Sequence, residues 1–542
     1  MQLTWKLGEM PETELSLSDL DMIRLMEEMD PRMRRKSALQ FLQRYLCFDG
    51  EEIRQRSLLL GELYEKSSQE EVDALALDLA ALSEEKRKYD QASDRIHTLL
   101  YAGRRMEIYV RCVEKIFEMA SRGFISPRMQ ELREETGRIR MSESYEACVK
   151  ALKEHRERII FPKSIRVGIN TQEDAHPVEM GVLSESAETE PLNPLIGMED
   201  PSMPARSLFP EMIYNRERYG THFEEYLAGC LEKRWKGKLG KALEVWKKVE
   251  APQEQRLWSL AEDFAFYAVG LRVMNAFAKR GYRLCRPQIT EEALLKADWM
   301  MYPELALNSE SIQGNCVSLT EGGAVIVTGA NHSGKTSYLK TVGQILLLAQ
   351  LGFYVPAEKM AFRPVRRIFT LFSAGEDASM SASRMGVEIR ILAEMLDQVT
   401  QSDLVLINEP LTSTNPVEAV SICSDLICRF LEKRVTNLTV THLYDVYFLL
   451  RSKLAASQQS MLKSLVTQAR YEEDRGMIYS YQLIESEPLG NSYARETAEA
   501  FGITLPELIP DSGRLEKAAA FCTEESLKVM YMREEAEHGI SN

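Results

Sequence analysis

An eight-residue glycine motif restricts the folds open to this chain more than any other feature. Gly329 to Thr336 reads GANHSGKT and matches the pattern G-x-x-x-x-G-K-[ST] at every position. The motif follows a β-rich run, AVIVT, and opens an apolar helix, TSYLKTVGQILLLAQ. A strand, a glycine loop and a helix in this order predict an α/β domain that binds phosphate groups. The alternative is a strand-to-helix turn that contains its glycines and lysine by chance.

Each residue type in this loop has a chemical reason for its position. Gly329 and Gly334 let the backbone curl without Cβ clashes, so that N–H groups point at phosphate oxygens and the helix N-terminus adds its dipole. We expect Lys335 to lie against the β and γ phosphates, and the Thr336 hydroxyl to bind Mg²⁺. The loop therefore predicts ATP and Mg²⁺ as cofactors. The expected nucleotide-binding residues are Gly329, Ala330, Asn331, His332, Ser333, Gly334, Lys335, Thr336 and Ser337.

A second strand ends in an amide followed by a carboxylate. Leu404 to Pro410 reads LVLINEP, and its apolar run predicts a buried parallel strand with Asn408 and Glu409 at the carboxyl end. Glu409 is the candidate general base for the water that attacks the γ-phosphate. Asn408 stands where hydrolases of this kind have an Asp, so it offers Mg²⁺ a carbonyl oxygen without a charge. We expect slower hydrolysis but not its loss, because the base is a separate residue; a polar-capped core strand is the alternative.

A third strand ends in a histidine. Asn437 to Thr441 reads NLTVT and is followed by His442, which is positioned to sense the γ-phosphate if the strands are parallel neighbours. A lone histidine is more often structural, and that alternative stays open. The predicted catalytic residues are thus Lys335, Glu409 and His442.

Composition excludes several classes of protein. The chain has 542 residues, of which 44% are hydrophobic, so we expect two to four domains with a large core. Its net charge of −15 argues against a surface that attracts nucleic acid everywhere. The nine cysteines are scattered, which points to a reducing compartment and no zinc site. Because no signal peptide and no run of about 18 apolar residues is present, we expect a cytoplasmic protein without a membrane segment.

The hydrophobic pattern changes three times along the chain. Residues 15–161 have helical spacing, and the runs IRVGIN and VEMGVL then predict a small hairpin. A Pro-rich and acidic linker follows, and helical spacing returns over residues 211–280. From about residue 297, short β-rich runs alternate with helices, which is typical of a parallel α/β sheet.

Four stretches in this order resemble the ATPase domain of the MutS family of DNA mismatch-repair proteins, a branch of the ABC-type ATPases. They are TGANHSGKTSYLK, GFYVPAEKMAFRPVRRIFTLFSAGEDASMSASRMGVEI, LVLINEPLTST and TVTHLYD. The run from Phe353 to Phe372 is the most diagnostic, because generic phosphate-loop proteins have nothing like it. The stretch FLQRYLCFDGEEIRQRSLLLGELYE resembles the helical core that precedes the family's lever arms, so Leu15 to Ile503 can be read on one plan.

The resemblance implies an α/β P-loop ATPase domain of ABC type, preceded by a long all-α core and lever region with a small β insertion between lever helices. It also implies a homodimer that sandwiches each nucleotide, in which Ser383 matches the serine that reaches the partner's γ-phosphate. The implied domains are a helical core and lever (1–164), a hairpin with acidic linker as a reduced clamp (165–212), returning lever helices (213–290), the ATPase domain (291–487), and a C-terminal helical dimer contact (488–542).

The chain also departs from the family pattern. We expect no N-terminal mismatch-recognition domain with its Phe-x-Glu wedge and no Smr-type tail; the Phe-Glu-Glu triplet at 223–225 lies mid-chain in a helical segment and is read as chance. The loop after Glu409, PLTSTNP, lacks the family's usual glycines. Ile312 stands where an aromatic residue often stacks on adenine, so we expect weaker binding of the base.

Two functional hypotheses follow. The first is an ATP-driven dimeric clamp on DNA, either mismatch-repair-like or on branched or generic duplex DNA, without specific recognition of mismatches. The second is a nucleotide-gated protein-interaction switch that touches no DNA. DNA binding depends on three basic patches, each of which has a solvated helix face as its alternative. The third patch is the best candidate because Trp235 can stack on a base. The patches are Arg32, Arg34, Arg35 and Lys36; Lys86, Arg87 and Lys88; and Lys233, Arg234, Lys236, Lys238 and Lys241 with Trp235.

Overall fold

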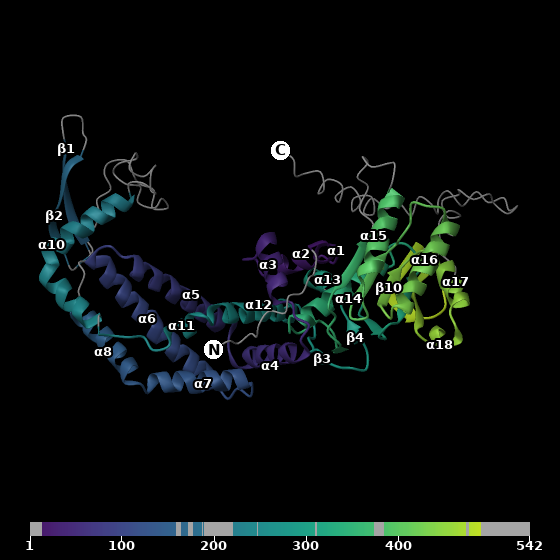
Figure 1. The fold of residues 1–542 in the computed structure, drawn as a ribbon, viewed down its shortest axis with the longest axis horizontal. Coiled ribbons are helices and arrows are strands. Elements are labelled where there is room, and N and C mark those ends of the chain that lie inside the picture. The colour runs from purple at the N-terminus through teal and green to yellow at the C-terminus, as the bar shows by residue number, and fades with distance from the viewer. Residues whose placement is uncertain are drawn as a thin grey trace. The chain divides into compact units, whose positions relative to one another are not determined.

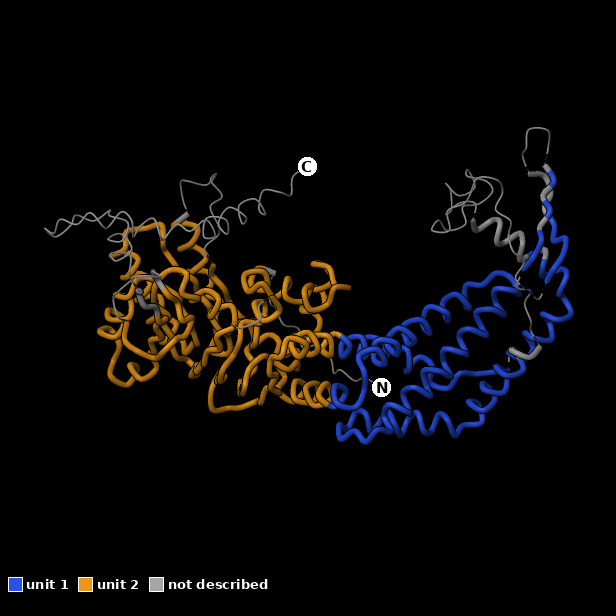
Figure 2. Tube along the Cα trace, turned by 180° about the vertical axis from the view of Figure 1, so that it is seen from behind, with its two compact units in different colours: residues 1–4, 62–268 blue, residues 5–61, 269–542 orange. Residues whose placement is uncertain are grey.

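The structure is a computed structural model that describes residues 14–158, 164–171, 177–186, 188, 220–246, 248–308, 312–372, 384–472 and 476–488. The chain divides into two compact units, which Figure 2 shows in different colours. Unit 1 contains residues 1–4 and 62–268, and unit 2 contains residues 5–61 and 269–542. The predicted domain boundaries at 164 and 290 differ from these divisions and stay predictions.

Unit 1 is helical, as the spacing of its apolar residues predicts. In the helix Arg95–Ala120, buried residues recur at helical spacing and include Leu99, Met106, Val113 and Ile116. One face of that helix therefore packs in the core. Asp94 caps the same helix by accepting a hydrogen bond of 2.9 Å from the backbone N–H of His97. The helices are α5 (Gln69–Gln91), α6 (Arg95–Ala120), α7 (Pro127–Arg140), α8 (Glu143–Arg158), α10 (Gly220–Trp246) and α11 (Glu254–Trp258). Helices α4 (Gly50–Lys66) and α12 (Ala261–Ala278) each span a division between the units.

A β-hairpin stands between α8 and α10, in agreement with the predicted β insertion. Its strands are β1 (Ser164–Thr171) and β2 (Pro177–Ser186), which pair antiparallel. Helix α10 is kinked at Trp235, where φ is −105° and ψ is 17°. At this kink the indole Nε1 donates a hydrogen bond of 3.2 Å to Glu185 of β2, and Arg234 forms an ion pair with the same carboxylate. The hairpin is therefore joined to the helix that carries the third basic patch.

Unit 2 is built on a six-stranded sheet in the order β12-β11-β6-β10-β9-β8. The five strands from β11 to β8 are parallel, and β12 is antiparallel at the edge. Every residue of β6 and of β10 is buried, as expected for parallel strands that are covered on both faces. The structure thus has an α/β sheet where the alternating runs predict one. The strands are β6 (Ala324–Thr328), β8 (Ile368–Phe372), β9 (Leu404–Asn408), β10 (Thr436–Val440), β11 (Leu462–Glu472) and β12 (Gly476–Glu485).

Four helices connect and cover these strands (Figure 1). They are α14 (Lys335–Gln350), α15 (Arg384–Gln398), α16 (Pro416–Glu432) and α17 (Asp445–Lys453). Val405 and Ile407 of β9 pack with Cys423, Ile427 and apolar residues of α15 and α17 in one core cluster. The burial of this cluster holds the strand ends in place, and these ends carry the predicted site residues.

Unit 2 also contains a second sheet, in the order β3-β7-β4-β5, and further helices, some of which come from the beginning of the chain. The sheet consists of β3 (Gln288–Ile289), β4 (Leu295–Met300), β5 (Asn315–Leu319) and β7 (Lys359–Phe362). The helices are α1 (Glu14–Asp19), α2 (Met22–Met29), α3 (Arg35–Tyr45), α13 (Pro303–Asn308) and the short α18 (Ala456–Gln459).

Three predictions fall outside the described residues. These are Ser383, the C-terminal helical segment after residue 488, and most of the acidic linker. Among the described residues, the longest apolar helices fall short of what a bilayer crossing requires.

Candidate functional site

The glycine motif forms a tight loop between β6 and α14. Gly329 has φ +143°, and a Cβ added there would lie 1.8 Å from Thr467 Oγ1, so a side chain is excluded. Gly334 has φ +90° and is the N-cap of α14. His332 is also left-handed, with φ +62°. The Ser333 hydroxyl donates a hydrogen bond of 2.6 Å to the carbonyl of Ala330, which ties the two sides of the loop together.

The Lys335 ammonium lies inside this loop. Nζ donates hydrogen bonds of 2.9 Å to the carbonyls of both Gly329 and Ala330, and it lies 3.9 Å from Oε1 of Glu409. Burial lowers the pKa of Lys335, and the nearby Glu409 carboxylate opposes this effect. Only 4% of the side chain is exposed, so the ammonium has little competition from water for an anion that enters the loop.

The two predicted metal ligands lie side by side. The Thr336 hydroxyl at the start of α14 donates a hydrogen bond of 2.9 Å to the Asn408 side-chain carbonyl at the end of β9. A hydroxyl and an amide carbonyl are both oxygen donors of the kind that Mg²⁺ accepts, alongside waters and phosphate oxygens. The pair therefore suits a Mg²⁺ ion whose other ligands are mainly the phosphate oxygens of a bound anion.

Glu409 lies between Lys335 and His442. Its backbone N–H donates to the carbonyl of Val440 at 2.8 Å, and its φ is +48°. Oε2 lies 3.7 Å from Nδ1 of His442. The His442 contact is the largest influence on the pKa of Glu409 and lowers it; burial raises the pKa, and Lys335 lowers it further. Glu409 is therefore an anion near neutral pH, as a general base must be.

A carboxylate on α15 holds the loop that follows Glu409. Leu411 is left-handed, with φ +59°, and its N–H donates a hydrogen bond of 2.7 Å to Oε1 of Glu388. Glu409 and Leu411 both have left-handed backbone conformations although neither is a glycine, so forming this loop costs free energy. Sequence reasoning missed Glu388, because an acidic residue on an amphipathic helix carries no local motif.

Part of this site lines one cavity of about 830 Å³, which is within the range of roughly 300–1,000 Å³ for small-ligand sites. The predicted site residues in its lining are Asn331, His332, Gly334, Lys335, Thr336, Ser337, Asn408 and Glu409, whereas Gly329, Ala330, Ser333 and His442 are not among the lining residues. We call the lining that comes from the glycine loop, Asn408 and Glu409 the polar end of the cavity. The remaining lining, which we call the apolar end, is mostly apolar and aromatic, and its Tyr481 lies close to Gly334 of the loop. Its lining includes Met300, Tyr302, Leu305, Ile312 and Tyr481.

The apolar end contains residues that the sequence did not identify. Ile312 is among the lining residues, and Tyr302 and Tyr481 also line the cavity. Asn315 holds β12 against this end, since its amide donates to the carbonyl of Tyr481 at 2.9 Å and its carbonyl accepts from the N–H of Leu483 at 2.8 Å. The signal available in the sequence was weak, because these residues lie in separate parts of the chain.

The second and third basic patches differ in their surroundings. The second patch is paired along its own helix, where Lys86, Arg87 and Lys88 contact the carboxylates of Asp90, Glu84 and Glu85 respectively. In the third patch, Lys233, Lys236, Lys238 and Lys241 are exposed on α10. The third patch is accordingly the stronger candidate for contact with a polyanion.

A parallel sheet with a polar cavity at its carboxyl edge is the arrangement in which open α/β domains bind ligands. Residues 325–515 match the family model described as MutS domain V. Over 309 residues it is 28% identical to the DNA mismatch repair protein MutS of Thermus thermophilus, which covers 57% of this chain and 35% of that protein. It is 28% identical over 232 residues to human MutS protein homolog 4, which covers 42% of this chain and 24% of the human protein. The chain thus spans about a third or less of the length of these relatives.

Proposed function

We propose that unit 2 binds ATP with Mg²⁺ in the 830 Å³ cavity and hydrolyses it. The observation that carries this proposal is the convergence of Lys335, the Thr336–Asn408 pair and Glu409 on the polar end of one cavity. These side chains come from two elements that are far apart in the sequence. Together they offer an anion site, a cation site and a base, which is the set of groups that phosphoryl transfer to water requires.

Each residue has a distinct part in the proposed reaction. The loop N–H groups and Lys335 bind the β and γ phosphates and stabilise the charge that develops on them. Thr336 and Asn408 would hold Mg²⁺, which neutralises phosphate charge when bound. Glu409 accepts a proton from the attacking water, and His442 keeps the Glu409 carboxylate ionised. Because Asn408 adds no negative charge, we expect modest Mg²⁺ affinity and slow turnover.

The proposed quaternary state is a homodimer in which Ser383 of one subunit completes the other subunit's nucleotide site. The support for this is the MutS relationship. We propose that this dimer acts as a nucleotide-gated clamp on generic or branched duplex DNA. The name of the Thermus relative as a DNA mismatch repair protein and the exposed lysines of α10 favour DNA over the alternative, a protein-interaction switch.

Two experiments test these proposals in turn. The first measures ATP binding and steady-state hydrolysis by the full chain and by Glu409→Gln. We expect binding to be retained and turnover to fall by about 10²- to 10⁴-fold, the usual contribution of a general base. Unchanged turnover would show that Glu409 is not the base, and absence of ATP binding by the unaltered chain would refute the proposed function.

The second experiment titrates duplex, branched and mismatched DNA in the presence of ATP at several salt concentrations. A DNA clamp predicts affinity that falls steeply with salt and that weakens in a Lys236→Ala, Lys238→Ala, Lys241→Ala variant. Salt-independent or absent binding to all three DNAs would favour the protein-interaction switch.

A further inference from the structure

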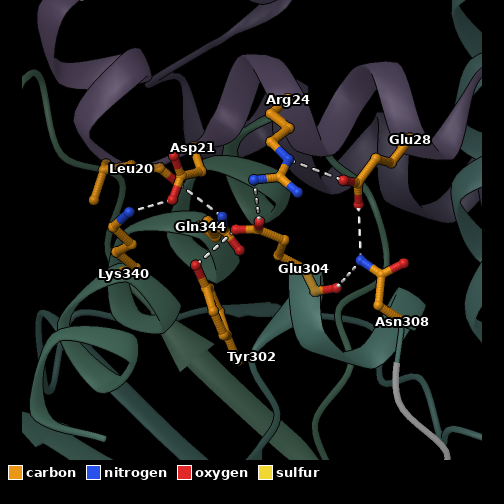
Figure 3. A network of polar contacts seen from close by, with 9 residues as sticks. All are labelled: Leu20, Asp21, Arg24, Glu28, Tyr302, Glu304, Asn308, Lys340 and Gln344. Carbon is orange, nitrogen blue, oxygen red and sulfur yellow. Dashed lines mark hydrogen bonds and ion pairs between the residues drawn. The ribbon is translucent and has the colours of Figure 1, made fainter. Parts of the chain in front are cut away.

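Helix α13 forms part of the apolar end of the cavity and is held by a ring of polar contacts with α2 (Figure 3). Arg24 contacts Glu304 at 3.2 Å and Glu28 at 3.0 Å. Glu28 accepts a hydrogen bond of 3.2 Å from the amide of Asn308, which also donates to the carbonyl of Glu304 at 3.1 Å. The ring thus holds both ends of a helix that has only six residues.

Glu304, a member of this ring, also contacts a residue of the cavity wall. Tyr302 lines the cavity, and its hydroxyl donates a hydrogen bond of 2.8 Å to Oε2 of Glu304. Arg24 contacts the other oxygen of the same carboxylate. Burial and the bond to Glu304 both raise the pKa of Tyr302, so its hydroxyl stays protonated and remains a donor. Glu304 therefore joins the cavity wall to α2 through both of its oxygens.

The residues just before helix α2 in turn pack on α14, the helix that begins with Lys335. Leu20 packs so closely on Gly343 that a Cβ added there would lie 2.6 Å from the leucine methyl group. The Gln344 amide donates a buried hydrogen bond of 2.7 Å to the carbonyl of Leu20, and Lys340 forms an ion pair with Asp21. These contacts fix the start of α2 (Figure 3), and therefore the position of Arg24, relative to the cavity.

We propose that Glu304 and Arg24 are positioning residues that orient the Tyr302 ring against the base of the bound nucleotide, so that nucleotide affinity depends on helix α2. This inference rests on the proposed function. It assigns the apolar end of the cavity to the base and the glycine loop to the triphosphate. It follows that loss of the Arg24–Glu304–Tyr302 chain weakens binding of the base and leaves binding of the triphosphate intact.

The test compares the affinities of the full chain for ATP and for inorganic tripolyphosphate, both with Mg²⁺. Glu304→Ala and Arg24→Met should each weaken ATP binding and raise KM roughly 3- to 10-fold, the usual effect of losing one hydrogen-bonded partner. Tripolyphosphate affinity and kcat should stay within about twofold of the unaltered chain, since the loop is not touched. Arg24→Lys should recover part of the ATP affinity.

Tyr302→Phe provides a milder variant that keeps the ring and removes only the hydroxyl. It should weaken ATP binding by a similar factor, and adding it to Glu304→Ala should cause no further loss, because both changes break the same contact. A disturbance of folding would instead lower the affinities for both ligands and the melting temperature.

Glu135→Ala is the matched control. Glu135 pairs with Arg256 at 3.1 Å, with side chains 18% and 60% exposed, close to the 14% and 64% of Glu304 and Arg24. It lies in unit 1 and should leave both affinities unchanged. The positioning role is overturned if Glu304→Ala matches this control, or if it weakens ATP and tripolyphosphate equally. Failure of the unaltered chain to bind ATP would instead refute the proposed function and this inference with it.

Discussion

The two ends of the cavity are built in different ways. The proposed phosphate end consists of one continuous loop, Gly329 to Thr336, together with the end of β9. The proposed base end collects Tyr302, Ile312 and Tyr481 from separate parts of the chain, and its support reaches back to Arg24 near the start of the chain. A continuous loop keeps its geometry through its own backbone, whereas an assembled wall depends on every element that supports it. Substitutions in the supports should therefore affect the two ends differently.

The largest effect is expected at the phosphate end. Lys335→Ala removes a buried ammonium and should weaken binding of both ATP and tripolyphosphate by roughly 100-fold, because hydrogen bonds to charged groups are the strongest of their kind. Isothermal titration with each ligand measures the loss. A decrease confined to ATP would show that Lys335 does not contact the triphosphate.

A smaller effect is expected where a supporting residue acts on the loop that follows Glu409. Glu388→Ala leaves the Leu411 N–H without its acceptor and releases a loop that has two left-handed residues. We expect kcat to fall about 10-fold while the affinity for ATP is unchanged, since Glu388 does not line the cavity. Glu394→Ala on the same helix is the control. Equal effects of the two substitutions would mean that α15 acts only through its stability.

A substitution at the predicted metal-binding pair should strengthen Mg²⁺ binding instead of weakening it. Asn408→Asp adds a negative charge beside the Thr336 hydroxyl and should lower the Mg²⁺ concentration for half-maximal hydrolysis by about 3- to 10-fold. Titration of Mg²⁺ at saturating ATP measures the change. An unchanged midpoint would indicate that the amide is an adequate substitute for the carboxylate.

The smallest effect is a shift in pH dependence. His442 is the main cause of the lowered pKa of Glu409, so His442→Ala should raise that pKa toward its ordinary value. A base is lost as the pH falls through its pKa, and the acidic limb of the kcat profile should therefore move to higher pH. An acidic limb that stays in place, or moves to lower pH, would remove His442 from this role.

These differences also explain what the sequence could predict. The glycine loop, the strand ends at Asn408 and Glu409, and the hairpin all follow from local patterns, since each is a short contiguous run with its own backbone requirement. Glu388 and Glu304 could not be predicted, because each acts on a residue brought near it only by the fold. For the same reason, the sequence could not predict that residues 5–61 group with the sheet in unit 2. Leu20 fits Gly343 across more than three hundred residues, and no periodicity in either segment indicates this contact.

The ratio of ATP affinity to tripolyphosphate affinity tests the central claim most directly, since it isolates the base end of the cavity. Tyr302→Ala removes a ring from that end, and we expect ATP affinity to fall about 10-fold, the usual effect of losing an aromatic contact with a base. Tripolyphosphate affinity should not change, so the ratio should fall by the same factor. An unchanged ratio in Tyr302→Ala would contradict the assignment of this end of the cavity to the base.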